Sequence, residues 1–211
     1  MELDMLRLAS GLLLALGVST LAAEPHAPKP SEPSVRVECH GKLRHGVVAI
    51  GSETTGSTIT FDGTTWELKL PDDPSRAFAK EHHKQPVTAI GSLRRVVGTE
   101  VPVRWIVEVE RLSVRDDGAH KEGASLTVSG KLRAADAVAG ESPRTVIEAA
   151  GITWPLDLAS DPDLAAKVKS LVGKPVVLVG RLEHGSYAKS PPRQIIRVNR
   201  LEASTAGAPP K

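Results

Sequence analysis

Few side chains of this sequence could do covalent chemistry, and their spacing does not favour it. The single cysteine, Cys39, stands next to His40. Neighbouring residues of a strand point to opposite faces, so the two do not make a nucleophile with its base. Ser186 to Lys189 match the S-x-x-K pattern, but they stand in an expected loop rather than at a helix start, and the companion K-T-G motif does not occur. We therefore predict no catalytic residue.

The seven histidines are the residues that could hold a metal. His82 and His83 are adjacent, and His40 and His45 stand five positions apart. None of these makes the H-x-x-x-H or C-x-x-C spacing that places ligands on one face. We expect no metal and no cofactor. A metal-dependent hydrolase with its site between two domains stays open as an alternative, with His82 and His83 as the residues to test.

The N-terminus has the pattern of an export signal. Residues 8–18 form an apolar run too short to cross a bilayer, which takes about 20 residues, and the small residues of "STLAA" follow it. We predict a signal peptide at residues 1–23 and a secreted or periplasmic location in a bacterial envelope, with no transmembrane segment after its removal. An uncleaved N-terminal anchor is the alternative. Because there is only one cysteine, the core must hold the exported chain together without an intrachain disulfide.

Four blocks of sequence recur in the same order at an offset of 88 or 89 positions. They are "GKL" at 41 and 130, "TWELKL" at 65 with "TWPLDL" at 153, "QPVTAIGSL" at 85 with "KPVVLVGRL" at 174, and "RWIVEVERL" at 104 with "RQIIRVNRL" at 193. The distances between blocks recur as well as the blocks themselves. This pattern predicts a duplicated domain, with two copies of about 80 residues each.

Each copy contains an expected hairpin. Residues 57–70 read as two alternating strands around Asp62-Gly63, a dipeptide favoured in tight turns because both positions take positive φ. The second copy has Ala150-Gly151 at the corresponding place. Trp66 and Trp154 fall in phase with the leucines of their strands, so we predict that both rings lie in the core.

A short helix is expected after each hairpin. Asp161 is a predicted N-cap with Pro162 in the first turn, and Gly173 is the predicted stop. The same opening, "DDPSRAFAKEHHK", occurs in the first copy, where the apolar face is weaker and centred on Phe78. Two strands then complete each copy, with inward positions at Val107, Val109, Ile196 and Val198.

The order of three strands, a helix and two strands resembles the OB-fold, a five-stranded, partly open Greek-key barrel. We therefore predict a mainly β protein of two tandem OB-like barrels, each with one short helix between its third and fourth strands. The expected segments are the signal peptide, a Pro-rich linker at 24–34, barrel 1 at 35–113, a linker at 114–123, barrel 2 at 124–203 and a tail at 204–211. The phrase "GVVAIGSETTGSTI" is also similar to one in uncharacterised secreted bacterial proteins.

The OB-fold resemblance implies where a ligand would bind, because these barrels use the face of strands two and three and the loops between strands one and two and between strands four and five. The loops between strands four and five, "RRVVGTEVPVR" and "EHGSYAKSPPR", supply the candidate binding residues: Arg94, Arg95, His184, Tyr187, Lys189 and Arg193. Such polar side chains are also what any solvated loop carries.

The hairpin face argues against nucleic acid. Binders of single strands combine a basic groove with aromatic platforms. The outward positions of the two hairpins here are mixed or acidic and carry no aromatic ring: Thr58, Thr60, Glu67, Lys69, Glu148 and Asp157. Charge is nearly balanced, with 27 Lys and Arg against 25 Asp and Glu, and aromatic residues make up only 3% of the chain. We therefore predict that nucleic acid is not a partner.

The last strand of each copy carries opposite charges on its outward side. Glu108 and Glu110 stand in the first copy where Arg197 and Asn199 stand in the second. We expect the barrels to face each other, or a partner, through these charges. The resulting prediction is a secreted or periplasmic, non-catalytic binding or assembly module whose partner is a protein or an envelope component. Besides the metal-dependent hydrolase, an oligosaccharide- or nucleotide-binding protein that uses the loops between strands four and five is the alternative.

Overall fold

The computed structural model describes residues 32–48, 54–98, 103–115, 121–135, 144–158, 161–187 and 190–204. The predicted signal peptide, most of the predicted Pro-rich linker and most of the predicted tail lie outside this part of the chain, so export stays a prediction. Within the described ranges, no helix has both the length and the apolar character needed to cross a membrane.

Strands make up most of the described structure. The elements in chain order are β1 (Ser34–His45), β2 (Ser57–Phe61), β3 (Thr64–Lys69), α1 (Asp73–Glu81), β4 (Pro86–Val96), β5 (Arg104–Val114), β6 (Gly123–Ala135), β7 (Arg144–Ala149), β8 (Ile152–Asp157), α2 (Pro162–Leu171), β9 (Pro175–Tyr187) and β10 (Ser190–Ala203). The prediction of a mainly β protein is confirmed.

The N-terminal half, β1 to β5, is a closed five-stranded barrel. Its strands pair in the order β2-β3-β5-β4-β1, and a further pairing of β1 with β2 closes it. The long strand β1 makes this possible because it pairs with β2 through residues 42–45 and with β4 through residues 36–42. The β3–β5 pairing is parallel, and α1 lies between β3 and β4 in the chain. The predicted OB-type barrel is therefore present.

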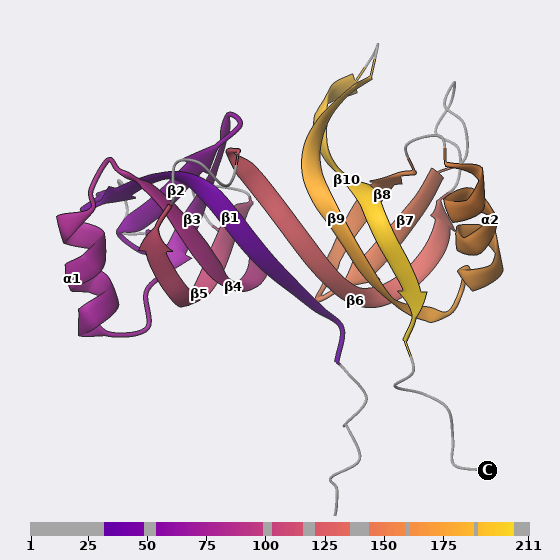
Figure 1. Cartoon of the computed structure of the whole chain (residues 1–211), viewed down its shortest axis with the longest axis horizontal. Helices are drawn as coiled ribbons and strands as arrows, with labels where there is room; N and C mark the ends of the chain where they lie inside the picture. The colour runs from indigo at the N-terminus through magenta and orange to yellow at the C-terminus, as the bar shows by residue number, and fades with distance from the viewer. Residues whose placement is uncertain are drawn as a thin grey trace, which may run out of the picture.

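The C-terminal half, β6 to β10, pairs in the order β6-β7-β8-β10-β9, with an additional β6–β9 pairing. The two halves are joined by antiparallel pairing of β1 with β6, which makes one ten-stranded sheet. In Figure 1 these two strands run side by side at the centre, with α1 and α2 on opposite outer sides. Val37 stands directly opposite Leu126 in this pairing, and the two residues are 89 positions apart in the chain.

The hairpins and the core follow the predicted pattern. Both positions of each turn take positive φ, at 44° and 73° for Asp62 and Gly63 and at 49° and 72° for Ala150 and Gly151. The inward side chains of the first hairpin are buried, and so are the predicted inward positions of β5 and β10; this core includes Ile59, Phe61, Trp66, Leu68, Val107, Val109, Trp154, Ile196 and Val198.

The helices begin at the predicted caps. The Asp72 carboxylate accepts a hydrogen bond from the Ser75 N–H at 2.9 Å, and the Asp161 carboxylate accepts two, from Asp163 and Leu164. Such caps satisfy N–H groups that have no partner within the helix. The apolar face of α1 consists of the buried Ala79 and the partly buried Phe78, which packs against the core and whose ring lies 4.1 Å from that of His82.

Candidate nucleic-acid interface

The outward side of β1 carries two cations beside a row of hydroxyl groups. Lys42 stands opposite Thr60 of β2 and Arg44 stands opposite Thr58, and both basic side chains are exposed. Across the hairpin, the Thr60 and Thr65 hydroxyls are 3.0 Å apart. Within the described part of the chain, neither Lys42 nor Arg44 has an ion-pair partner, so both charges face solvent. Thr58, predicted as an outward residue, is buried at 8% exposure. We call Lys42, Arg44, Thr60 and Thr65 the hairpin face.

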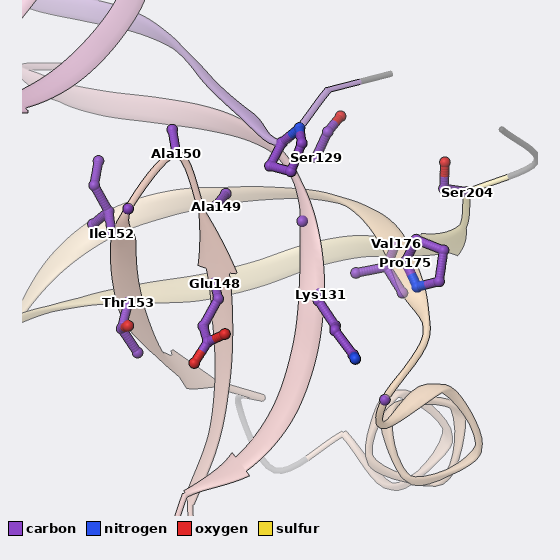
Figure 2. A pocket seen from close by; sticks show the side chains of 14 residues that line it. Ser129, Lys131, Glu148, Ala149, Ala150, Ile152, Thr153, Pro175, Val176 and Ser204 are labelled. Atoms are coloured by element: carbon purple, nitrogen blue, oxygen red, sulfur yellow. The ribbon is translucent and has the colours of Figure 1, made fainter. Parts of the chain in front are cut away.

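In the C-terminal half, β6 carries Lys131 and Arg133. Lys131 is exposed and stands opposite Glu148, while Arg133 forms a 2.7 Å ion pair with that same carboxylate. Lys131, Glu148 and Thr153 line a pocket of about 560 Å³ whose other walls are mostly short side chains and turn residues. Figure 2 shows the Lys131 and Glu148 side chains extending in the same direction from neighbouring strands. Glu148 is thus paired with Arg133, and Lys131 has no ion-pair partner among the described residues.

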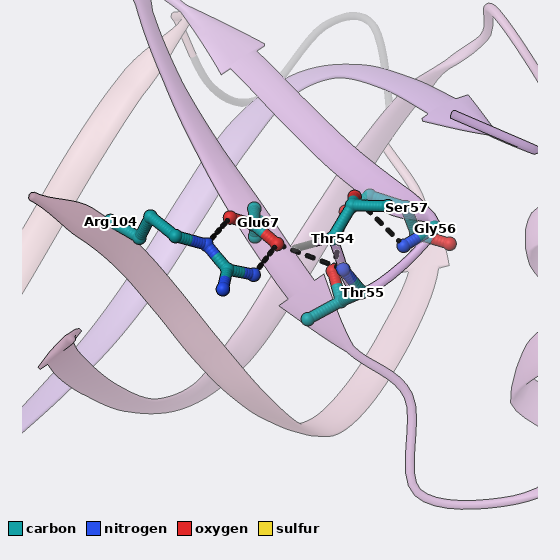
Figure 3. A network of polar contacts seen from close by, with 6 residues as sticks. All are labelled: Thr54, Thr55, Gly56, Ser57, Glu67 and Arg104. Carbon is teal, nitrogen blue, oxygen red and sulfur yellow. Dashed lines mark hydrogen bonds and ion pairs between the residues drawn. The ribbon is translucent and has the colours of Figure 1, made fainter. Parts of the chain in front are cut away.

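Glu67, which the sequence places on the outward side of the first hairpin, does not present a free carboxylate. Arg104 donates to both of its oxygens, at 2.6 and 2.7 Å, and the Thr55 N–H donates to one of them at 2.9 Å. Figure 3 shows how this network ties β5 and the segment before β2 to β3. Burial acts to raise the pKa of Glu67, but the hydrogen bonds from Arg104 and Thr55 and the Arg104 charge outweigh it and hold the pKa below its ordinary value.

The Arg104→Met variant tests this pairing. We expect a loss of about 1–3 kcal/mol in the free energy of unfolding at pH 7, because a mostly buried carboxylate loses its partner. In the wild type, the low pKa of Glu67 contributes stability above the unfolded-state pKa of about 4.3, and this contribution is lost as the pH falls through the folded value. Urea unfolding at pH 7 and pH 3 should therefore show a smaller gap between wild type and variant in acid.

The matched control for that experiment is Arg76→Met, which removes an exposed ion pair with Asp73 on α1. Surface pairs of this kind contribute about 0–1 kcal/mol, so little change is expected at either pH. A wild-type to Arg104→Met gap of the same size at pH 7 and pH 3 would show that the ionised Glu67 carboxylate does not need Arg104.

The predicted loop residues of the N-terminal half lie at the end of β4. Arg94 is exposed and pairs with Glu108 at 2.8 Å. Arg95 is exposed and stands directly opposite Trp105 of β5. No ion pair of Arg95 occurs among the described residues. Arg94 is therefore paired with the Glu108 carboxylate, whereas the Arg95 guanidinium is accessible to solvent.

The predicted loop residues of the C-terminal half are only partly described. His184 on β9 stands opposite Gln194 of β10, and its Nε2 lies 2.9 Å from the Thr64 hydroxyl of the N-terminal half. The backbone of Tyr187 lies at the end of β9 and that of Arg193 lies in β10. Lys189 lies outside the described residues. His184 is thus part of the contact between the halves.

Trp105 is a residue of interest that the sequence did not single out. Its ring is half-buried and lies 6.4 Å from the Trp66 ring and 5.0 Å from the Trp154 ring, so it stands between a core residue of each half. With five residues of the C-terminal half it lines a pocket of about 430 Å³: Val146, Thr153, Trp154, Pro155 and Gln194. We call this the junction pocket. The only sequence signal for it is that tryptophan in "RWIVEVERL" is replaced by glutamine in "RQIIRVNRL".

The proposed charge contact between the two last strands is wrong. Glu108 pairs with Lys69 and Arg94, and Glu110 pairs with Arg36, all within the N-terminal half. Arg197 pairs with Asp157 and Glu183 in its own half. The halves instead meet through β1 and β6, because main-chain pairing satisfies N–H and C=O groups along an otherwise open strand edge.

Cys39 is buried, and the side chains of His82 and His83 form hydrogen bonds with neighbouring residues. Cys39 is fully buried, and burial together with the nearby Glu38 charge raises the pKa of its thiol, so the reactive thiolate is disfavoured. His82 lies 2.9 Å from the Gln85 side chain, and the His83 ring accepts a hydrogen bond from the His45 N–H. Among the described residues, no group of three or more His, Cys, Asp and Glu side chains could hold a metal ion.

Comparison with known proteins gives a fold and no family. No family model and no curated protein matches the sequence. Among solved structures, a deletion mutant of the single-stranded DNA binding protein from Thermus aquaticus is 13% identical with a TM-score of 0.52, covering 85% of this chain and 98% of that chain. The wild-type protein from the same organism is 12% identical with a TM-score of 0.49, covering 86% and 98%. Because the first match takes in 85% of the chain, it includes strands of both halves.

This likeness overturns two predictions made from the sequence. The expectation that nucleic acid is not a partner is contradicted, and so is the main functional reading, a binding or assembly module for a protein or an envelope component. The physical reason lies in the charges and the aromatic ring that the folded chain presents. The sequence argument counted Glu67 and Glu148 as free acids, but each is paired with an arginine, and it counted no aromatic platform, although Trp105 is half-buried at the junction.

Proposed function

We propose that this protein binds single-stranded nucleic acid along the hairpin face. The observation that carries the proposal is the exposed pair of Lys42 and Arg44, which have no ion-pair partner in the described structure and stand beside the hydroxyls of Thr60 on β2 and Thr65 on β3. Lysine and arginine bind phosphates electrostatically, and hydroxyl groups donate to phosphate oxygens. The place of this face also supports the proposal, because OB barrels bind ligands on strands two and three.

The charged residues around the hairpin face are compatible with the binding of a polyanion. Glu67 is neutralised by Arg104, and Arg94 and Lys69 share Glu108 beside it, so the acids near the hairpin face already have cationic partners. The net charge of the chain is only +2. We therefore expect binding that depends on local cations and that weakens as salt rises, rather than the tight binding of a strongly basic protein.

We also infer that the C-terminal half is a second copy of the same barrel, packed on the first about an approximate two-fold axis. The strand pairings occur in the same order in both halves. Val37 and Leu126, which face each other across the junction, are 89 positions apart, as are the recurring sequence blocks around them. A two-fold contact uses the same patch on both partners, which is the pattern of β1 on β6.

Under this inference the cations of the hairpin face occur twice. Lys131 and Arg133 of β6 stand 89 positions after Lys42 and Arg44. A single strand would then contact two related faces, and since one OB barrel covers about 4–16 nucleotides, the pair would cover about 8–32.

Fluorescence anisotropy of labelled oligothymidylates tests the proposal on the chain without its predicted signal peptide. We expect binding that strengthens with length up to about 30 nucleotides, weakens between about 50 and 200 mM salt, and is much weaker for duplex DNA of the same length. If the protein bound DNA only through non-specific electrostatic contacts, it would bind duplex DNA at least as tightly as single strands, which would contradict the proposal. No binding to any oligonucleotide at low salt would reject the proposed function.

A further inference from the structure

We propose that the junction pocket holds one unstacked base of the bound strand against the ring of Trp105. This rests on the proposed function, since the base would belong to a strand that the cations of β1 and β6 hold. The pocket lies where β5 of the N-terminal half meets β7, β8 and β10 of the C-terminal half, so neither half forms it alone. A base held here would contact both halves at once.

The size and lining of the pocket suit a flat heteroaromatic ring. Its volume of about 430 Å³ lies within the range of about 300–1,000 Å³ that is usual for small-molecule sites. Val146 and Pro155, which face each other across β7 and β8, supply apolar surface, and Thr153 and Gln194 supply hydrogen-bonding groups. An apolar wall with a few convergent polar groups is the usual composition of such a site.

The Trp105 ring is already held in place. It contacts the Trp66 and Trp154 rings, with an interplanar angle of 35° to each, and these two neighbours are almost completely buried. The Trp105 ring itself keeps part of its surface exposed at the pocket. A base that stacks on a ring fixed in this way pays little conformational entropy on the protein side.

Polar groups for the base edge and for its phosphate lie around the ring. The Trp154 side chain lines the pocket, is 2% exposed, and its Nε1–H has no hydrogen-bond partner among the described residues. A buried donor without a partner is costly. The Gln194 amide can both donate and accept. Arg95, opposite Trp105 on β4, places an exposed guanidinium beside the ring.

The Trp105→Leu variant tests the proposal, because leucine keeps apolar bulk at the junction and removes the π-face. Stacking of one base on an aromatic side chain corresponds to about 5- to 150-fold in affinity. We expect the dissociation constant for an oligothymidylate of about 30 nucleotides to rise by that factor, with the slope of its salt dependence unchanged. Trp105→Phe, which keeps a ring, should recover most of the affinity.

Gln194→Ala is the second variant, for the case in which Trp105→Leu does not fold. Loss of one neutral hydrogen bond corresponds to about 2- to 12-fold in affinity. The loss should differ between oligothymidylate and oligoadenylate, since the amide contacts the base edge. Lys80→Ala is the control for the loss of an exposed side chain elsewhere. Lys80 is an exposed residue of α1 and belongs neither to the hairpin face nor to the junction pocket.

The outcomes separate the two proposals. If the wild type binds oligonucleotides and both the Trp105→Leu and Gln194→Ala variants bind with unchanged affinity, the junction pocket holds no base and the proposed function stands. If the wild type does not bind at all, the proposed function and this inference both fall. A loss for Trp105→Leu that Trp105→Phe restores, together with a base-dependent loss for Gln194→Ala, supports both.

Discussion

Replacing Lys42, Arg44 and Lys131 together with alanine should raise the dissociation constant for single-stranded DNA by about 100-fold at 0.1 M salt. Each cation that contacts a phosphate on a single strand releases about 0.7 of a counterion, which at this salt corresponds to about 1 kcal/mol. Three contacts give about 3 kcal/mol, and the slope of the logarithm of the affinity against that of the salt concentration should become shallower by about 2. The residues are exposed and form no ion pair in the described structure, so their removal should not affect folding.

A salt titration by anisotropy measures both quantities, and a matched triple variant controls for net charge. Lys80, Lys167 and Lys169 are exposed residues of α1 and α2, so Lys→Ala changes at these positions remove the same number of charges away from the β1 and β6 faces. We expect this variant to keep the wild-type slope within about 0.7. Equal losses in the two triple variants would mean that overall charge, and not these two faces, governs binding.

The elements that could be predicted from the sequence are those set by neighbours in the chain. The Asp62-Gly63 turn follows from the φ values that such a turn requires, and the Asp161 cap follows from N–H groups of the first helical turn that lack partners. The burial of Trp66 follows from a side-chain period of two along a strand. Each of these depends on fewer than ten consecutive residues, so no tertiary information was needed.

What could not be predicted depends on pairs far apart in the chain. The Glu67–Arg104 ion pair joins residues 37 positions apart, and without it Glu67 is interpreted as a free acid beside the hairpin face. The β1–β6 pairing joins two edges that have no complementary sequence signal, since main-chain groups make the bonds. Trp105 belongs to a strand whose inward positions are core, and only the approach of the other half turns its ring into a pocket wall. The argument against nucleic acid from the sequence lacked two of these facts, the Glu67–Arg104 pair and the position of the Trp105 ring.

The second large effect is expected from Gly91→Ala, because a side chain at this position would overlap main-chain atoms of the neighbouring strand. A Cβ at Gly91 would overlap the carbonyl oxygen of Glu108 on β5 and stand 2.8 Å from its carbonyl carbon. These are main-chain atoms of the neighbouring strand, so relief requires β4 and β5 to separate where the register already shifts, between Ile90 and Gly91. Gly180 in "KPVVLVGRL" meets the main chain of Arg197 in the same way, at 2.5 Å from its carbonyl oxygen. The glycine shared by the two recurring phrases is therefore required by the closeness of two strands.

We expect Gly91→Ala to lower the free energy of unfolding by about 3 kcal/mol, the upper end of the usual cost of overpacking, because backbone cannot move aside as a side chain can. For a protein of this size, about 2–4 °C per kcal/mol gives a fall in Tm of about 6–12 °C. Thermal unfolding followed by circular dichroism measures it, with Ser92→Ala as the control, since Ser92 is the exposed next residue of β4. A Gly91→Ala variant with the Tm of Ser92→Ala would show that β4 and β5 lie further apart than this closed barrel requires.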